Sequence, residues 1–194
     1  MFDWLFGKAP PPDPPSVDRV WVDLAARDAA IVREAGKGPV VIYAFFEATL
    51  ERVRQALLAA GRTPGADLVL VRADRPARGP EGAAILVAER HPLPVANRNL
   101  LARLAGDHPG VVPVFFTALD DGLMQRFSGD RTANLMRQLG LSADEPVEHT
   151  FVSKALANAR EKVAQKAGPA AELDLTAPSM EAWLDRHIGP GAAR

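Results

Sequence analysis

Seven consecutive apolar residues, Val40–Phe46 (VVIYAFF), place the strongest constraint on what this chain can fold into. A strand with one face in water alternates apolar and polar side chains, because successive side chains point to opposite faces of the sheet. This run does not alternate, and it is rich in β-branched and aromatic residues. Such a run is typical of a strand that is covered on both faces, as in a parallel sheet with helices above and below it.

The neighbouring segments alternate between strand and helix patterns. Asp23 can cap a helix that runs to about Ala35, and a second helix is expected from about Thr49 to Ala60, ended by Gly61. Its apolar stripe is formed by Leu50, Val53, Leu57 and Leu58. A further helix is expected at 97–105, and strands at 20–22, 68–71, 84–88 and 111–117. This order predicts an α/β fold with an open, mainly parallel sheet.

Ligands of open parallel sheets bind at the carboxyl ends of the strands. In this chain those ends are expected at residues 46–47, 72–74, 89–91 and 117–121. Two clusters of polar residues lie there, Glu89-Arg90-His91 and Asp120-Asp121. Either cluster can form a site. Alternatively, Glu89-Arg90-His91 can be a hydrogen-bond network that only positions the fold. Asp120-Asp121 can be two acids at the start of a helix, where their charge favours its positive end.

After Leu119 the pattern becomes helical, with helices expected at 123–127, 134–139 and 147–166. The last of these carries an apolar stripe of Phe151, Val152, Leu156, Ala159 and Val163. Its opposite, solvated face holds Lys154, Arg160, Glu161 and Lys162. A final helix, capped by Ser179, has Met180, Trp183, Leu184 and Ile188 on its inner side. We therefore expect a tail and linker at 1–16, an α/β domain at 17–145 and a helical extension at 146–194.

Composition excludes several classes of protein. The chain has no cysteine, so it contains no disulfide and no thiolate metal site. A net charge of −1 argues against nucleic-acid binding, which needs a concentrated basic face. Such binding would require a basic groove lined by Arg72, Arg75, Arg78 and Arg103. No apolar run approaches the roughly 20 residues that span a bilayer.

The amino-terminal segment is apolar and precedes the proline-rich stretch Ala9–Pro15, which is expected to be an extended linker. The segment is either a frayed tail or a contact for a partner or a membrane surface, through Phe2, Trp4, Leu5 and Phe6.

A search for catalytic motifs finds none of the common ones. The sequence lacks a GxxxxGK[ST] loop, a GxGxxG fingerprint, a GxSxG elbow and an HExxH pair. Its histidines are His91, His108, His149 and His187, and no two are three or four residues apart. We therefore expect surface or helix-capping histidines and no metal site.

The stretch from Glu89 to Lys162 resembles the preprotein translocase motor ATPase SecA. Glu89-Arg90-His91 is similar to the family's ERH, and Phe115–Arg131 (FFTALDDGLMQRFSGDR) is similar to its FFLSLEDDLMRRFGSDR. Leu135–Val163 resembles the family's LMDRLG…EP-IEH-VS-AIENAQ-KV stretch. The resemblance implies a helicase-C/RecA-like second motor domain followed by the start of the scaffold helix, without the first motor domain.

The departures from the family concern its nucleotide site. The family's QLRGRAGRQGD places arginines against a nucleotide held between two motor domains. The same register puts Asn99 at the glutamine, Leu101 at the first arginine and Arg103 at the second. The family's GRGTDI segment is also missing, with only Ala77–Pro80 in its place. Leucine cannot place charge against phosphate, and the phosphate-binding lysine belongs to the absent domain.

These observations predict a noncatalytic SecA-like accessory or binding module, which is not an ATPase and has no cofactor of its own. We expect a protein partner, plausibly the translocation machinery, and a cytoplasmic location that includes contact with the membrane periphery. One alternative is a nucleotide-responsive subunit that lends Arg103 to an ATP site on a partner. A second is a small enzyme that uses Glu89, Asp120 and Asp121. The candidate nucleotide-facing or partner site comprises Glu89, Arg90, His91, Asn99, Arg103, Asp120 and Asp121.

Overall fold

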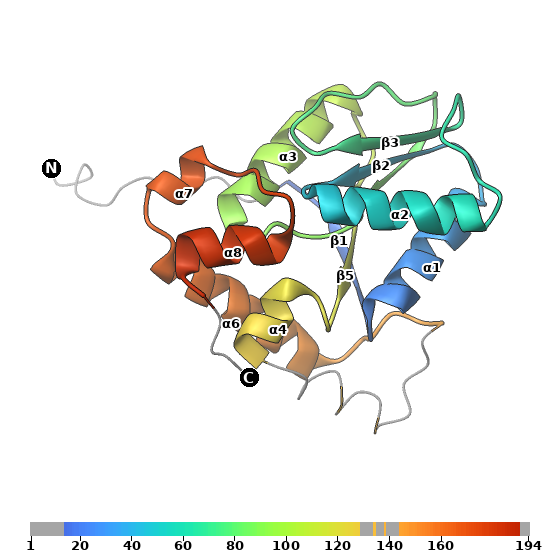
Figure 1. Ribbon diagram of the computed structural model, residues 1–194. Coiled ribbons are helices and arrows are strands. Elements are labelled where there is room, and N and C mark those ends of the chain that lie inside the picture. Colours follow the sequence, from blue (N-terminus) through green and yellow to red (C-terminus); the bar gives the residue numbers. More distant parts are fainter. Residues whose placement is uncertain (1–13, 129–133, 135–137, 139–143, 191–194) are drawn as a thin grey trace, which may run out of the picture.

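A computed structural model describes residues 14–128, 134, 138 and 144–190. Five parallel strands form one sheet in the order β1-β5-β4-β2-β3 (Figure 1). The strands are β1 (Val17–Trp21), β2 (Val40–Ala44), β3 (Leu68–Arg72), β4 (Ala84–Val87) and β5 (Val114–Ala118). The predicted α/β class with an open parallel sheet is confirmed, and it is of the helicase-C/RecA-like kind.

The apolar run that dominates the sequence forms β2 and the turn that follows it. All five residues of β2 are buried, and the strand lies between β3 and β4. Val40 is in register with both Leu68 and Ala84, so the sheet continues without a gap across β2. The short connection between β3 and β4 lies against the sheet, and a Cβ on Gly79 would come within 2.3 Å of Val41 Cγ2.

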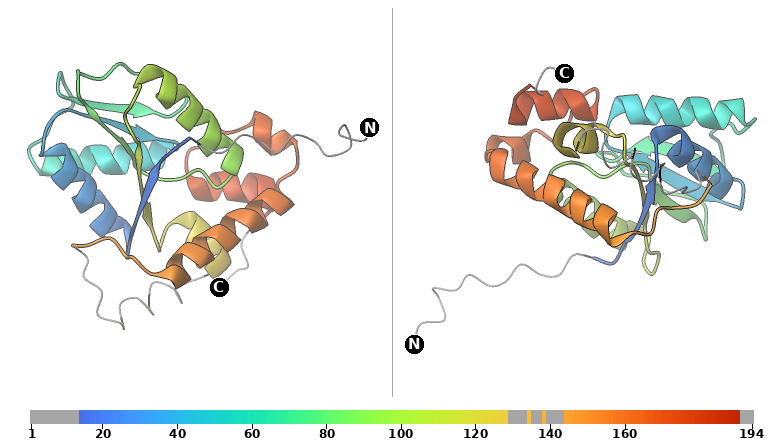
Figure 2. Two further views of the ribbon diagram at one scale, coloured as in Figure 1. Left: turned by 180° about the vertical axis from the view of Figure 1, so that it is seen from behind. Right: turned by 90° about the horizontal axis from the view of Figure 1, so that it is seen from below.

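Helices cover both faces of the sheet. Helices α1 (Leu24–Ala35) and α2 (Glu47–Ala59) pack on one face, and α3 (Pro94–Asp107) packs on the other. Figure 1 shows α2 in front of the sheet, and the view from behind in Figure 2 brings α3 to the front. Phe115 and Phe116 lie in the two different apolar cores, so these neighbours on β5 point to opposite faces, as the alternation of a strand requires.

The carboxyl-terminal helices extend the core on the α3 side. They are α4 (Gly122–Ser128), α6 (Thr150–Lys166), α7 (Ala170–Leu173) and α8 (Met180–Ile188). Val152, Leu156, Ala159 and Val163 of α6 are buried in the same apolar core as Trp183 of α8. The apolar stripe of α6 is therefore covered by this chain's own residues. The predicted cap of α8 is confirmed, since the Ser179 hydroxyl accepts a hydrogen bond from the Ala182 N–H.

Three sequence predictions about side-chain positions were wrong. Leu58 of α2 is 43% exposed and Phe151 of α6 is 48% exposed, although both were expected on buried stripes. Arg160 was expected on a solvated face, but its Nε is buried, and burial lowers the pKa of its guanidinium. Each of these side chains lies at the border of its helix's buried face, where the neighbouring elements decide exposure.

Several boundaries also differ from the predicted ones. Strand β5 begins at Val114, immediately after Pro113, because proline has no N–H to donate to the ladder. Helix α3 begins earlier than expected, with Pro94 at its first position, where a missing N–H costs nothing. Strand β1 extends back to Val17, and α7 was not predicted. The tail residues Phe2, Trp4, Leu5 and Phe6, and most of the helix expected at 134–139, lie outside the described residues.

Among the described helices, none combines the length and the apolar character that crossing a bilayer requires.

The two-faced burial of β5 predicts the effect of truncating its aromatic residues. Phe115→Ala and Phe116→Ala should each lower the free energy of unfolding by about 3–5 kcal/mol, because each leaves a cavity in a separate core. Urea titration followed by circular dichroism measures this. Leu173→Ala is the control, since Leu173 is 92% exposed and its truncation should change stability by less than about 0.5 kcal/mol. A Phe116 variant as stable as wild type would contradict the packing on the α1 face.

Candidate functional site

The sheet forms a crevice between the carboxyl ends of β2 and β4. These strands are neighbours, but the chain leaves β2 into α2 on one face and leaves β4 toward α3 on the other. Such a divergence is the position at which open α/β sheets bind their ligands. Glu89 follows β4 directly and lies at this point.

The Glu89 carboxylate fills the amino terminus of α2. Its Oε1 accepts hydrogen bonds from the backbone N–H groups of Phe45 (3.0 Å) and Phe46 (2.9 Å). Its Oε2 accepts one from the Thr49 hydroxyl at 2.6 Å. Phe46 precedes the helix and has no side chain that could cap it. Glu89 therefore satisfies the N–H groups of the two residues that precede α2, and in the first turn of the helix the Ala48 N–H donates to the Pro178 carbonyl at 2.9 Å.

Two buried acids and a buried arginine surround this point. Glu89 is 2% exposed, Asp121 is 6% exposed and Arg27 is 1% exposed. Burial raises the pKa of the Glu89 carboxyl to about 7, against the opposing effects of the Thr49 hydroxyl and the Arg27 charge. Burial likewise raises the pKa of Asp121 to about 6. Arg27 donates to Asp28 Oδ1 at 2.7 Å, which holds its guanidinium within this cluster.

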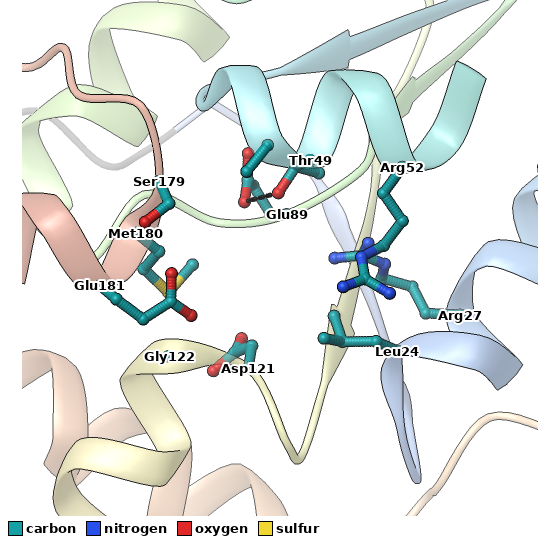
Figure 3. Close-up of a pocket in the computed structure, with 11 residues that line it drawn as sticks. Leu24, Arg27, Thr49, Arg52, Glu89, Asp121, Gly122, Ser179, Met180 and Glu181 are labelled. Atoms are coloured by element: carbon teal, nitrogen blue, oxygen red, sulfur yellow. Dashed lines mark hydrogen bonds between the residues drawn. The ribbon is translucent and has the colours of Figure 1, made fainter. Parts of the chain in front are cut away.

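These side chains line a small polar cavity, shown in Figure 3. Its volume is about 70 Å³, and its walls include Leu24, Arg27, Thr49, Arg52, Glu89, Asp121, Ser179, Met180 and Glu181. Among the described residues, no three histidine or acidic side chains converge to hold a metal ion.

Asp120 and Asp121 are both used to begin helices. Asp121 Oδ1 accepts from the Met124 N–H at 2.9 Å and so caps α4. Asp120 Oδ1 accepts from the Leu24 N–H at 2.8 Å, at the start of α1, which lies almost a hundred residues earlier in the sequence. The interpretation that these acids stabilise helix termini is thus supported by specific bonds, although one of the helices is distant in sequence.

His91 is a core residue, and the expectation of a surface or capping histidine was wrong for it. It is fully buried, and its ring packs against Phe45, Phe46 and Trp183. Its Nδ1 accepts from the Leu93 N–H at 3.0 Å, which leaves Nε2 to donate to the Leu175 carbonyl at 3.2 Å. Burial lowers the pKa of His91 to about 4, so the neutral imidazole is the form that the fold accommodates.

Asn97 was missed by the sequence analysis, although it holds the turn that carries His91. Its Oδ1 accepts from the His91 N–H at 3.0 Å, and its Nδ2 donates to the His91 carbonyl at 2.8 Å. The available signal was an asparagine close to the start of a proline-initiated helix, a position where a short amide reaches preceding backbone. Arg27 and Thr49 were also missed.

Arg90 points away from the crevice. Its guanidinium pairs with Asp18, donates to the Ser16 hydroxyl at 3.1 Å, and lies 3.7 Å from the centre of the Phe115 ring. It thereby fastens the start of β1 to the middle of the sheet. The structure gives Arg90 a role in joining strands and places it outside the polar cavity.

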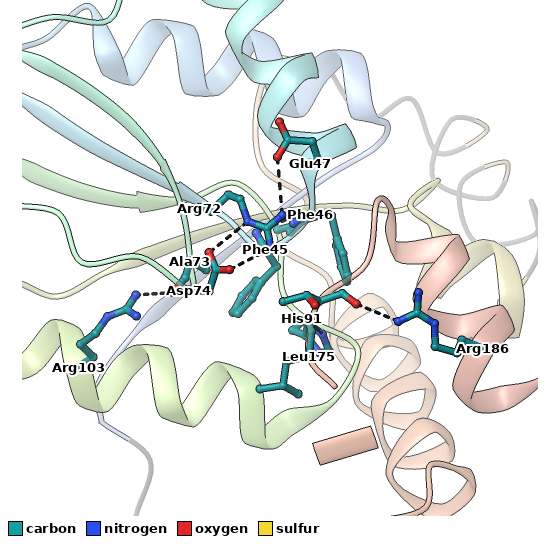
Figure 4. A network of polar contacts seen from close by, with 12 residues as sticks. Phe45, Phe46, Glu47, Arg72, Ala73, Asp74, His91, Arg103, Leu175 and Arg186 are labelled. Carbon is teal, nitrogen blue, oxygen red and sulfur yellow. Dashed lines mark hydrogen bonds and ion pairs between the residues drawn. The ribbon is translucent and has the colours of Figure 1, made fainter. Parts of the chain in front are cut away.

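Asn99 and Arg103 line a second, separate cavity of about 180 Å³. Figure 4 shows Arg103 donating to the Ala73 carbonyl at the end of β3, beside the Arg72–Asp74 pair. Arg103 Nε also lies 4.0 Å from Asp107 Oδ2, one helical turn further along α3. Leu101, which takes the place of the family's first arginine, is 3% exposed and belongs to the apolar core.

The residues predicted to form one site are thus divided between different environments. Glu89 and Asp121 share the polar cavity, while Asn99 and Arg103 share the second cavity. His91 lies in the core, Arg90 on the β1 side, and Asp120 at the start of α1. The basic groove that nucleic-acid binding would need is also partly neutralised, because Arg72 pairs with Asp74 and Glu47.

The fold and its crevice define the class of the protein: an α/β module of the helicase-C/RecA-like kind. Within that class, comparison with known proteins confirms the resemblance to SecA. The protein translocase subunit SecA of Sorangium cellulosum is 38% identical over 85 residues, which are 44% of this chain. Those of Psychrobacter cryohalolentis and Acinetobacter baylyi are 40% and 38% identical over 82 residues, or 42% of this chain. No protein-family model matches the chain.

The match covers only 8–9% of the length of these SecA proteins. The relationship is therefore one between part of this chain and a small part of a much longer protein. The assignment of that part to the second motor domain stays a prediction.

The raised pKa of Glu89 predicts how Glu89→Gln changes stability with pH. The folded-state pKa of about 7 lies above the ordinary 4.5, so the folded protein loses stability through this group as pH rises from about 4.5 to about 7. Glutamine keeps acceptor and donor atoms in place and does not titrate. The variant should match wild type near pH 4 and exceed it near pH 8 by on the order of 1–3 kcal/mol.

Denaturant titrations at several pH values measure this difference. Asp121 contributes in the same direction and His91 in the opposite one, but both are present in the two proteins and cancel in the comparison. Glu81→Gln, at an exposed turn, is the control and should follow wild type at every pH. A Glu89→Gln variant that is less stable at pH 8 than wild type would show that the fold needs the ionised carboxylate.

Proposed function

We propose that this chain is a noncatalytic SecA-like module that binds a protein partner and accompanies preprotein translocation. The observation that carries the proposal is the residue at the place of the family's first arginine. Leu101 is 3% exposed and packs in the apolar core, so it cannot set a charge against a phosphate. Glu89 does not decide the question, because the same glutamate is part of the family's ERH motif.

Three further features support a noncatalytic role. The sequence lacks a GxxxxGK[ST] phosphate-binding loop. The family's GRGTDI segment is also missing, with only Ala77–Pro80 in its place. The strand-end acids that a small enzyme would use are Glu89, Asp120 and Asp121, and all three accept backbone hydrogen bonds at helix termini.

The link to translocation comes from the relatives, which are named protein translocase subunit SecA. A shared segment of that size supports a partner in the same machinery, and hence a cytoplasmic location, with Phe2, Trp4, Leu5 and Phe6 available for contact with a partner or the membrane surface. The buried residues of α6, Val152, Leu156, Ala159 and Val163, do not supply the partner site, because they pack in this chain's own core.

Hydrolysis and affinity capture test this proposal directly. The purified protein should release no phosphate from ATP above the buffer background, because the sequence lacks a GxxxxGK[ST] loop and has Leu101 in place of the family's first arginine. In native lysate, the tagged protein should recover a SecA-type translocase to the same extent with and without ATP. Turnover that rises with protein concentration would refute the noncatalytic role, and failure to recover any translocation component would refute the association.

A second candidate function is a nucleotide-responsive subunit that contributes Arg103 to an ATP site in trans. It is favoured by one observation: Arg103 and Asn99 line the 180 Å³ cavity at the end of β3, outside the crevice that Glu89 fills. Under this function, Arg103→Ala should weaken ATP-dependent association with the partner by roughly 1.5–3 kcal/mol, the range of a charged hydrogen bond. Arg98→Ala, on the same helix but outside that cavity, is the matched control.

A further inference from the structure

Within the described residues, a later segment bonds to one edge of the sheet, and the other edge is open. At β1, the Val147 N–H donates to the Val20 carbonyl at 2.6 Å, so a later segment pairs with the outer side of that strand. At the opposite edge, β3 pairs with β2 on its inner side, and no described segment forms a ladder with its outer side. An open edge is a row of backbone groups suited to pairing with another strand.

The direction of the backbone groups in β3 follows from two bonds at its ends. The Val40 N–H donates to the Asp67 carbonyl, and the Ala73 N–H donates to the Ala44 carbonyl. Since successive residues of a strand turn their backbone groups to opposite sides, residues 67, 69, 71 and 73 face β2, and residues 68, 70 and 72 face outward. The carbonyls of Leu68 and Arg72 are used by the nearby N–H groups of Gly65 and Arg75. Within the described chain, both backbone groups of Leu70 remain unpaired at the centre of the edge.

The surroundings of this edge are apolar. The side chain of Leu70 is half-buried on the α2 face, and those of Val69 and Val71 are half-buried on the other face. Leu58 lies eleven residues after Glu47, about three helical turns, and so on the same side of α2. Glu47 forms an ion pair with Arg72 at the end of β3, so this side of α2 lies along the open edge. Leu58 is 43% exposed because it faces that edge.

We propose that the open edge of β3 binds an extended polypeptide segment of a partner chain, which adds to the sheet as a further strand. The unpaired backbone groups of Leu70 are complementary to the backbone of an extended chain. The apolar flanks select a segment whose alternate side chains are apolar or β-branched and pack beside Leu58 and Leu70 on one face and beside Val69 and Val71 on the other. This surface lies outside the crevice, so the proposal stands whether or not the chain acts beside a translocase.

A second copy of this chain fits the edge less well. Two β3 strands paired about a two-fold axis would place the axis at Leu70. Glu47 of α2 lies level with Arg72 of β3, since the two form an ion pair. Leu70 comes two residues before Arg72, a distance of roughly 6.6 Å along the strand. The same distance covers about four residues of α2, so Leu70 lies level with Glu51. The axis would therefore bring two Glu51 side chains together. Each already pairs with Arg54 at 2.7 Å and Gln55 at 2.6 Å on its own helix, so the contact between two copies gains no ion pair there.

Binding of a synthetic strand tests the proposal. The probe is a soluble, end-capped peptide of about eight alternating threonine and valine residues. It should bind the full-length protein and slow hydrogen exchange of the Leu70 amide by about tenfold or more, because that N–H becomes paired. Leu70→Pro removes the outward-facing N–H, together with the leucine side chain, and should abolish binding, while Leu70→Val keeps the donor and should retain it.

A second measurement does not depend on whether the proline variant folds. The same peptide with N-methyl groups on alternate amides cannot pair along the methylated side, and it should lose binding to the unmodified protein. Absence of binding, or equal binding of the methylated and unmethylated peptides, would overturn the proposal. Self-association of the protein that Leu70→Pro abolishes would also overturn it, by assigning the edge to a second copy.

Discussion

The rest of the structure depends on the bond between the Glu89 carboxylate and the amino terminus of α2. This bond joins the end of β4 to the start of the helix that follows β2, and it does so where the chain departs to the two faces of the sheet. Without it, the N–H groups of Phe45 and Phe46 would be buried and unpaired, at a cost of about 1–3 kcal/mol each. The bond thus stabilises the module at the point where open α/β sheets bind their ligands.

The surrounding charges explain how a carboxylate can remain at this depth. Arg27 is almost completely buried and acts on both Glu89 and Asp121, while Asp28 holds its guanidinium in place. Burial raises the pKa of both acids, so in this environment protonation competes with ionisation near neutral pH. His91 opposes their pH dependence, because its burial favours the neutral ring and so favours folding as pH rises above about 4. The pH dependence that His91 gives to the stability of the fold is thus opposite in sign to that of Glu89 and Asp121.

The sequence predicts those features that depend on local patterns. The unbroken run Val40–Phe46, the opposite faces of Phe115 and Phe116, and the cap at Ser179 all follow from strand alternation or from the first turn of a helix. The resemblance to SecA was also visible from ungapped motifs. The wrong or missed features depend on contacts between distant segments. Arg90 faces Asp18 from 72 residues away, Asp120 begins a helix near residue 24, and the core around His91 includes Trp183 from the last helix. No periodicity within one element contains that information.

The two proposals share one physical argument, which concerns where the chain satisfies its own polar groups and where it does not. In the crevice, Glu89 and the Pro178 carbonyl accept the N–H groups at the start of α2, so a ligand would have to displace a formed bond. At β1, Val147 pairs with the outward carbonyl of Val20. At β3, the groups of Leu70 have no such partner within the described chain. A partner strand could pair with them and break no bond within the described protein, which makes the edge a more favourable place for recognition than the crevice.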